Sequence, residues 1–134
     1  MKIEIKIGEE QISNVLCCAL EGGSNYWYML GDFDRKHFIA GEPLVDNLTR
    51  SFMLDPDYKV EVLDLESLEF DDDDDDEGHM ETLGYLTNAS MAYAFQQLAE
   101  HDQGRFGLII DMECDADDAD VWFQTAVMGE VVFG

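Results

Sequence analysis

A chain of 134 residues that is 46% hydrophobic can build one core but not two, so we expect a single domain over residues 1–134. Its formal net charge of −24, from 31 acidic and 7 basic residues, argues against direct nucleic-acid binding, which needs a surface rich in Lys and Arg. No apolar stretch reaches ~18 residues and no basic-then-apolar leader begins the chain. We therefore expect a cytoplasmic protein without membrane contact.

The first half of the chain predicts a strand and a helix, followed by a less regular stretch. Residues 1–7 alternate apolar and polar side chains, which is typical of a half-buried strand. Residues 9–21 place apolar side chains at helical spacing, and the double glycine at residues 22–23 ends that helix. Residues 24–57 predict loops and one or two short strands, one of them near residues 37–40.

Two further elements flank a strongly acidic segment. Residues 59–65 partly alternate and predict a strand, which an acidic loop at about residues 69–81 follows. Residues 88–101 predict a helix that begins at a capping Thr87 or Asn88.

The C-terminal part predicts a last helix over residues 115–128, capped by Asp115 and closed by Gly129. Residues 106–110 fit either a strand or a buried helical turn, and residues 130–133 fit a terminal edge strand. Together the elements predict an α+β fold with a small, largely antiparallel sheet, about three helices and one strongly acidic face.

The negative charge is concentrated in the second half. Residues 1–59 hold ten acidic and six basic residues, a net charge of −4, whereas residues 60–134 hold 21 acidic residues and Arg105, a net charge of −20. Repulsion of this size opposes folding, and solubility alone needs a net charge of magnitude ~2 to 8 in a small domain. We therefore expect the acidic side chains to serve a partner.

The most acidic segment is an unbroken run of seven carboxylates: Asp71, Asp72, Asp73, Asp74, Asp75, Asp76 and Glu77. Alone, such a run is most often a solvated loop, because like charges repel one another. An extended chain rises ~3.3 Å per residue, close to the ~3.4 Å between phosphates of one DNA strand, so the run also approximates the charge density of DNA. If the run mimics DNA in this way, its partner has a basic groove.

A second acidic cluster lies near the C-terminus and comprises Asp111, Glu113, Asp115, Asp117, Asp118 and Asp120. Helix capping explains Asp115, Asp117 and Asp118 but not the other three. A calcium-binding loop fits poorly, because the sixth position from Asp111 is Ala116 instead of Gly and the twelfth is Trp122 instead of Glu. We expect the whole cluster to contribute to partner binding.

Neither cysteines nor histidines form a recognisable site. Cys17, Cys18 and Cys114 lack the paired spacing of zinc ligands, and His37, His79 and His101 are scattered. We expect free thiols, no metal, no cofactor and no enzymatic activity.

The stretch Ser24, Asn25, Tyr26, Trp27 and Tyr28 allows two interpretations. An Asn among aromatic residues after a double glycine fits a small-molecule or cation pocket, for example one that sequesters a nucleotide signal. The same residues fit a structural turn whose aromatic rings pack on the core.

The sequence ALEGGSNYWY at residues 19–28 resembles a group of small phage and prophage proteins that share a LEGGSNYW motif. The C-terminal end is similar as well, through Asp115-Ala116, Ala119-Asp120-Val121, Gln124 and the GEVVFG at residues 129–134. Asp118 departs from the group, in which Thr is usual, and the acidic run is not a general feature of it. The resemblance implies a phage context and brings no catalytic residues.

By composition the chain also resembles acidic anti-restriction and anti-CRISPR proteins that mimic DNA. We therefore expect a phage-encoded inhibitor that acts in the cytoplasm of the bacterial host, as a monomer or homodimer. Its carboxylates would stand in for phosphates in a basic DNA- or RNA-binding groove of a host protein. The alternative function is a ligand-binding module built on residues 25–28.

Overall fold

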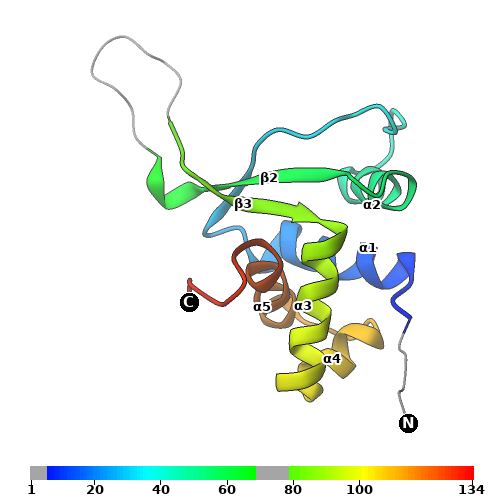
Figure 1. Cartoon of the computed structure of the whole chain (residues 1–134), viewed down its shortest axis with the longest axis vertical. Coiled ribbons are helices and arrows are strands. Elements are labelled where there is room, and N and C mark those ends of the chain that lie inside the picture. Colours follow the sequence, from blue (N-terminus) through cyan, green and yellow to red (C-terminus); the bar gives the residue numbers. More distant parts are fainter. Residues whose placement is uncertain (1–5, 69–78) are drawn as a thin grey trace.

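The computed structural model describes residues 6–68 and 79–134 (Figure 1). Within these ranges five α-helices accompany a three-stranded antiparallel sheet, so the predicted α+β class is confirmed. The predicted strand at residues 1–7 lies mostly outside the described residues, and residues 6–8 are not in a strand.

The first helix, α1 (Glu9–Cys18), forms where the apolar spacing predicted it, and it buries Ile12, Val15 and Leu16. It continues as a single π-helical turn, η1 (Ala19–Gly23), which ends where Ser24 N donates to Ala19 O at 2.9 Å. This wider turn carries the double glycine and directs the following loop toward the last helix.

Gly23 allows that loop to approach the last helix closely. A Cβ atom on Gly23 would lie 2.1 Å from the carbonyl oxygen of Ala116, whereas a Cβ on Gly22 would meet nothing within 4 Å. Only the second of the two glycines is therefore required by packing.

The sheet consists of β1 (Tyr28–Leu30), β2 (Lys59–Asp64) and β3 (Thr82–Thr87), in the order β1-β2-β3. β2 is the predicted strand, and it pairs antiparallel with both neighbours. The sequence analysis did not predict β3, because Gly84 interrupts the alternation of apolar and polar residues in this strand. That glycine lets β3 lie against the last helix, since a Cβ there would be 2.4 Å from Val127 O.

A helix, α2 (Leu44–Leu54), lies where the sequence predicted loops, and the strand predicted near residues 37–40 is absent. The helical spacing of apolar residues is hard to recognise in α2, because polar residues also lie on its buried face. Asn47 is one of them: its Oδ1 accepts from Ile39 N at 2.8 Å and its Nδ2 donates to Ile39 O at 3.3 Å. These bonds use the buried side chain to fasten the preceding loop.

The C-terminal half contains α3 (Asn88–His101), α4 (Gln103–Ile110) and α5 (Ala116–Met128). Both predicted N-caps are present: Thr87 Oγ1 accepts from Ser90 N at 3.0 Å, and Asp115 Oδ1 accepts from Asp118 N at 2.9 Å. Gly129 closes α5 with φ of 84°. Residues 106–110 are helical, and residues 130–133 form no strand.

The helices α1, α3 and α5 lie on one side of the sheet, with α5 next to both the sheet and α3 (Figure 1). The fully buried rings of Trp122 and Phe123 project from α5 into the core, where Phe123 meets Trp27 at 5.3 Å between ring centroids. No helix within residues 6–68 and 79–134 is long and apolar enough to cross a membrane.

Candidate functional site

The acidic run Asp71, Asp72, Asp73, Asp74, Asp75, Asp76 and Glu77 lies outside the described residues. The segment that contains it connects a 3₁₀ turn, η2 (Leu65–Ser67), to β3. Its described ends are joined by two bonds, from Asp64 N to Glu81 O and from Glu81 N to Ser67 Oγ, both 2.8 Å long. The segment is therefore attached at the end of the β2–β3 hairpin.

The second acidic cluster divides into an exposed and a buried part. Asp111, Glu113, Asp115 and Asp117 are exposed, on the connection between α4 and α5 and in the first turn of α5. Asp118 and Asp120 are buried, at 7% and 8% exposure. Only the exposed four have carboxylates accessible to a partner, because the buried carboxylates of Asp118 and Asp120 bond within the protein.

Asp118 is held by Arg105, the single Lys or Arg in residues 60–134. Arg105 Nε donates to Asp118 Oδ1 at 2.9 Å, and Arg105 Nη1 donates to Asp102 Oδ2 at 2.7 Å. The other oxygen of Asp118 accepts from Asp115 N at 3.0 Å. The one guanidinium of this half therefore bridges two carboxylates and offsets the charge of one of them.

Asp120 is the centre of a buried network in which its carboxylate accepts four hydrogen bonds from neutral donors. Ser24 Oγ and Trp27 Nε1 donate to Oδ1 at 2.8 and 2.7 Å. Tyr26 Oη and Gln124 Nε2 donate to Oδ2 at 2.7 and 3.0 Å. Three of the donors come from the Ser24–Tyr28 stretch, so this loop is fixed by a residue more than 90 positions away.

Gln124 extends the network to the C-terminal tail. Its Oε1 accepts from Val132 N at 2.9 Å and Phe133 N at 2.8 Å, and its Nε2 donates to Phe133 O at 3.0 Å. Phe133 also stacks on Trp27, with ring centroids 5.4 Å apart. The loop at residues 24–28 and the C-terminal tail thus meet in one cluster around Asp120 and Gln124.

The predicted ligand loop has little free polar capacity. Ser24 and Trp27 are buried, Asn25 is exposed, and Tyr28 Oη donates to Leu20 O at 2.6 Å. Partial desolvation and the bond to Asp120 raise the pKa of Tyr26 to about 12. A cavity of about 540 Å³ lies beside the loop, lined among others by Tyr26, Arg105, Asp120 and Phe133.

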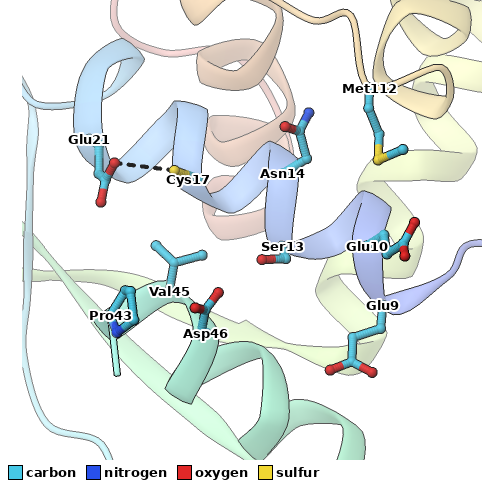
Figure 2. A pocket seen from close by; sticks show the side chains of 10 residues that line it. All are labelled: Glu9, Glu10, Ser13, Asn14, Cys17, Glu21, Pro43, Val45, Asp46 and Met112. Carbon is cyan, nitrogen blue, oxygen red and sulfur yellow. Dashed lines mark hydrogen bonds between the residues drawn. The ribbon is translucent and has the colours of Figure 1, made fainter. Parts of the chain in front are cut away.

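A larger cavity, about 800 Å³, lies between α1 and α2 and was not predicted. We call it the α1–α2 groove; its lining includes Glu9, Cys17, Glu21, Val45, Asp46 and Met112. Figure 2 shows Ser13 of α1 near Asp46 of α2, while Met112 lies on the other side of α1, near Asn14. Sequence analysis missed the groove because α2 itself was missed.

Thiol chemistry is not favoured in this groove. Cys17 Sγ donates to Glu21 Oε2 at 3.2 Å, and this bond together with burial raises the pKa of Cys17 to about 11. Desolvation and the neighbouring Cys18 raise the pKa of Cys114 to about 12. Both thiols are therefore protonated and poorly nucleophilic at neutral pH.

Within the described part of the chain, no three or more His, Cys, Asp or Glu side chains are grouped so as to hold a metal ion. Comparisons of the chain with protein-family models, curated proteins and solved structures found no match. Its function must therefore be inferred from its own residues.

Proposed function

We propose that the chain is a phage-encoded, non-enzymatic inhibitor that occupies a basic DNA- or RNA-binding groove of a host defence protein. The observation that carries this proposal is the accessibility of carboxylates in a half that has one cation. Asp111, Glu113, Asp115 and Asp117 are exposed, while Arg105 is engaged in its two ion pairs. A groove lined with Lys and Arg would find acceptors here without a competing positive charge.

The exposed carboxylates are attached to well-fixed backbone. Asp115 and Asp117 lie at the start of α5, and Asp111 and Glu113 lie on a connection that α1 holds. Gln11 Nε2 donates to Ile110 O at 3.1 Å, just before this connection, and Asn14 Nδ2 donates to Cys114 Sγ within it at 3.6 Å. Carboxylates at fixed separations can replace phosphates with little loss of conformational entropy on binding.

The acidic run would provide a second contact with the same partner. Its described neighbours lie at the end of the β2–β3 hairpin, away from α4 (Figure 1). A partner that contacts both acidic groups would therefore present an extended basic surface, as the nucleic-acid-binding grooves of proteins do. The net charge of −24 would also accelerate association, by an amount that falls as salt rises.

Capture from a bacterial lysate tests this proposal. The purified protein is used as bait, the beads are washed at low and then at high salt, and the eluted proteins are identified. We expect a DNA- or RNA-binding defence complex that is retained at low salt, is released at high salt and cannot bind its nucleic acid while the bait is present. Recovery of no basic partner would contradict the proposal.

Two matched variants separate specific contacts from total charge. The first neutralises the exposed cluster by D111N/E113Q/D115N/D117N, in which Asn at position 115 still caps α5. The control neutralises four exposed carboxylates elsewhere, by D32N/D57N/E66Q/E130Q. Both variants change the net charge equally, so inhibition weakened by the first and not by the second identifies the cluster as a contact.

The alternative function, a small-molecule or cation-binding module at residues 25–28, is supported by the cavity of about 540 Å³ beside the loop. The engagement of Ser24, Tyr26 and Trp27 by Asp120 counts against it. A nucleotide panel in a thermal-stability assay without any protein partner would distinguish the two, because a ligand of the native state raises Tm.

A further inference from the structure

The α1–α2 groove is large and is lined by several carboxylates and by an exposed methionine, Met112. Its volume of about 800 Å³ lies within the range of protein ligand sites, ~300 to 1,000 Å³. Its walls belong to two helices, so its shape is set by packed elements (Figure 2).

The charge of the groove is negative throughout. Four carboxylates line it, namely Glu9, Glu10, Glu21 and Asp46, and no Lys or Arg of residues 6–68 and 79–134 belongs to its lining. The basic residue of the adjoining hollow, Arg50, is already engaged by the carboxylate of Glu42 and by Asn47 Oδ1 at 2.8 Å. The groove therefore matches a positively charged occupant.

Its exposed apolar surface comes from Pro43 on one side of α1 and from Met112 on the other, because Val45 is only 5% exposed. Met112 has a positive φ of 56°, at the C-terminal end of α4. Met112 N donates to Ile109 O and Glu113 N donates to Leu108 O, the bonds of a Schellman motif. Glycine is the usual residue at this left-handed position, because it avoids the Cβ strain that other residues incur.

A methionine at that position costs stability and leaves its side chain 46% exposed at the groove. Folding alone therefore does not account for this side chain. An exposed, flexible thioether suits the binding of aliphatic side chains from a partner.

We propose that the α1–α2 groove docks an amphipathic segment of a protein partner, one that carries Lys or Arg beside aliphatic residues. The carboxylates would bind the cationic groups, while Pro43 and Met112 would contact the aliphatic parts. A nucleic acid is repelled by the same charge, and a second copy of the chain would bring another −24. The positive charge of the partner follows from the carboxylates of the groove, so the inference goes beyond the proposed function and does not depend on it.

A direct binding assay with purified protein tests the inference. The probe is a fluorescein-labelled peptide of about 14 residues, with Leu at i, i+3, i+4 and i+7 and Lys elsewhere. A second peptide carries Ser in place of every Leu. Fluorescence anisotropy is measured at physiological salt for wild type, for E9Q/E10Q/E21Q/D46N, and for the control D32N/D57N/E66Q/E130Q, which changes the net charge equally.

We expect the groove variant to weaken binding of the Leu peptide about tenfold or more, and the control to weaken it less than about threefold. Equal losses in both variants would overturn the inference, because they would show attraction by total charge alone. Binding of the Ser peptide as tight as that of the Leu peptide would overturn it too, as would equally effective competition by spermidine.

Met112→Gly is the sharpest single variant. We expect Tm to stay the same or rise while the affinity for the Leu peptide falls about threefold, with the Ser peptide unaffected. Unchanged affinity for the Leu peptide would contradict the role given to Met112. No host protein is used, so failure here leaves the proposed inhibition open, and failure of the lysate capture leaves this result intact.

Discussion

Asp120 and the carboxylates of the α1–α2 groove are the same chemical group in opposite settings. Asp120 is 8% exposed and accepts four hydrogen bonds, whereas Glu9 and Glu10 are exposed at the start of α1. A buried carboxylate is tolerated when its bonds are complete, and then its loss costs stability. Exposed carboxylates contribute little to stability, so they are available for binding.

This difference shows that a count of acidic residues overestimates the acidic surface. Of the six acidic residues from Asp111 to Asp120, two, Asp118 and Asp120, are buried and do not contribute to the acidic surface. The comparison also predicts how variants should separate: changes at the Asp120 network should lower the free energy of unfolding, and changes at the groove should mainly alter binding.

The largest effect is expected for Asp120→Ala. This change leaves the buried donors of Ser24, Trp27 and Gln124 without their acceptor, so we expect the free energy of unfolding to fall by about 3 kcal/mol. Urea denaturation measures it, with Asp117→Asn, an exposed neighbour on α5, as the control. A loss no greater than that of the control would contradict a structural role for Asp120.

The double glycine offers a matched pair. Gly23→Ala places a Cβ 2.1 Å from Ala116 O, and we expect a loss of about 2 kcal/mol, because η1 and α5 must move apart. Gly22→Ala meets open space and should be neutral or slightly stabilising. Similar melting temperatures for the two variants would show that the close approach does not matter.

Phe133→Ala should release the tail without unfolding the domain. The change removes the stacking on Trp27, for which we expect a loss of about 1 kcal/mol. Hydrogen exchange at Val132 N, which Gln124 protects, should then become faster. Retained protection at that amide would mean that Gln124 holds the tail alone.

Alkaline pH should weaken the bonds of Tyr26 to Asp120 and of Tyr28 to Leu20 O. The pKa of Tyr26 and of Tyr28 is raised from 10.0 to about 12, first by desolvation, so the folded state favours the protonated phenols. Their contribution is present below pH 10 and is lost as pH rises through about 12. In urea denaturation between pH 10 and about 12, Tyr26→Phe should lose less stability than wild type. The same pH dependence in both proteins would argue against a contribution from the Tyr26 hydroxyl.

The smallest effect on stability is expected in the groove. E9Q/E10Q/E21Q/D46N should change the free energy of unfolding by roughly 0.5 kcal/mol per site at most, because these side chains are exposed and relief of repulsion offsets lost helix-dipole contacts. A collapse in Tm would show that the groove is structural.

Local signals made part of the fold predictable. The ends of α3 and α5 follow from Thr87, Asp115 and Gly129, whose capping chemistry acts within a few residues. α2 and β3 were missed because Asn47 is buried where a polar residue is unexpected and Gly84 interrupts a strand. Asn47 is explained by its bond to Ile39 and Gly84 by the close approach of Val127, and the local sequence reveals neither contact.

The candidate site was less predictable for the same reason. The Asp120 network joins residues 93 to 96 positions apart, so spacing alone does not expose it. One signal was present: Asp120 and Gln124 are four residues apart, beside the apolar Ala119 and Phe123, and are therefore on a buried helix face. A charged residue on such a face indicates an internal partner.

One competition measurement tests the central claim most directly. Labelled DNA or RNA is bound to the captured host protein, and wild type, D111N/E113Q/D115N/D117N and D32N/D57N/E66Q/E130Q are each titrated in at constant salt. We predict displacement by wild type and by the second variant, and displacement weakened about tenfold or more for the first. Equal displacement by both variants, or none by wild type, would contradict the claim that these exposed carboxylates replace phosphates.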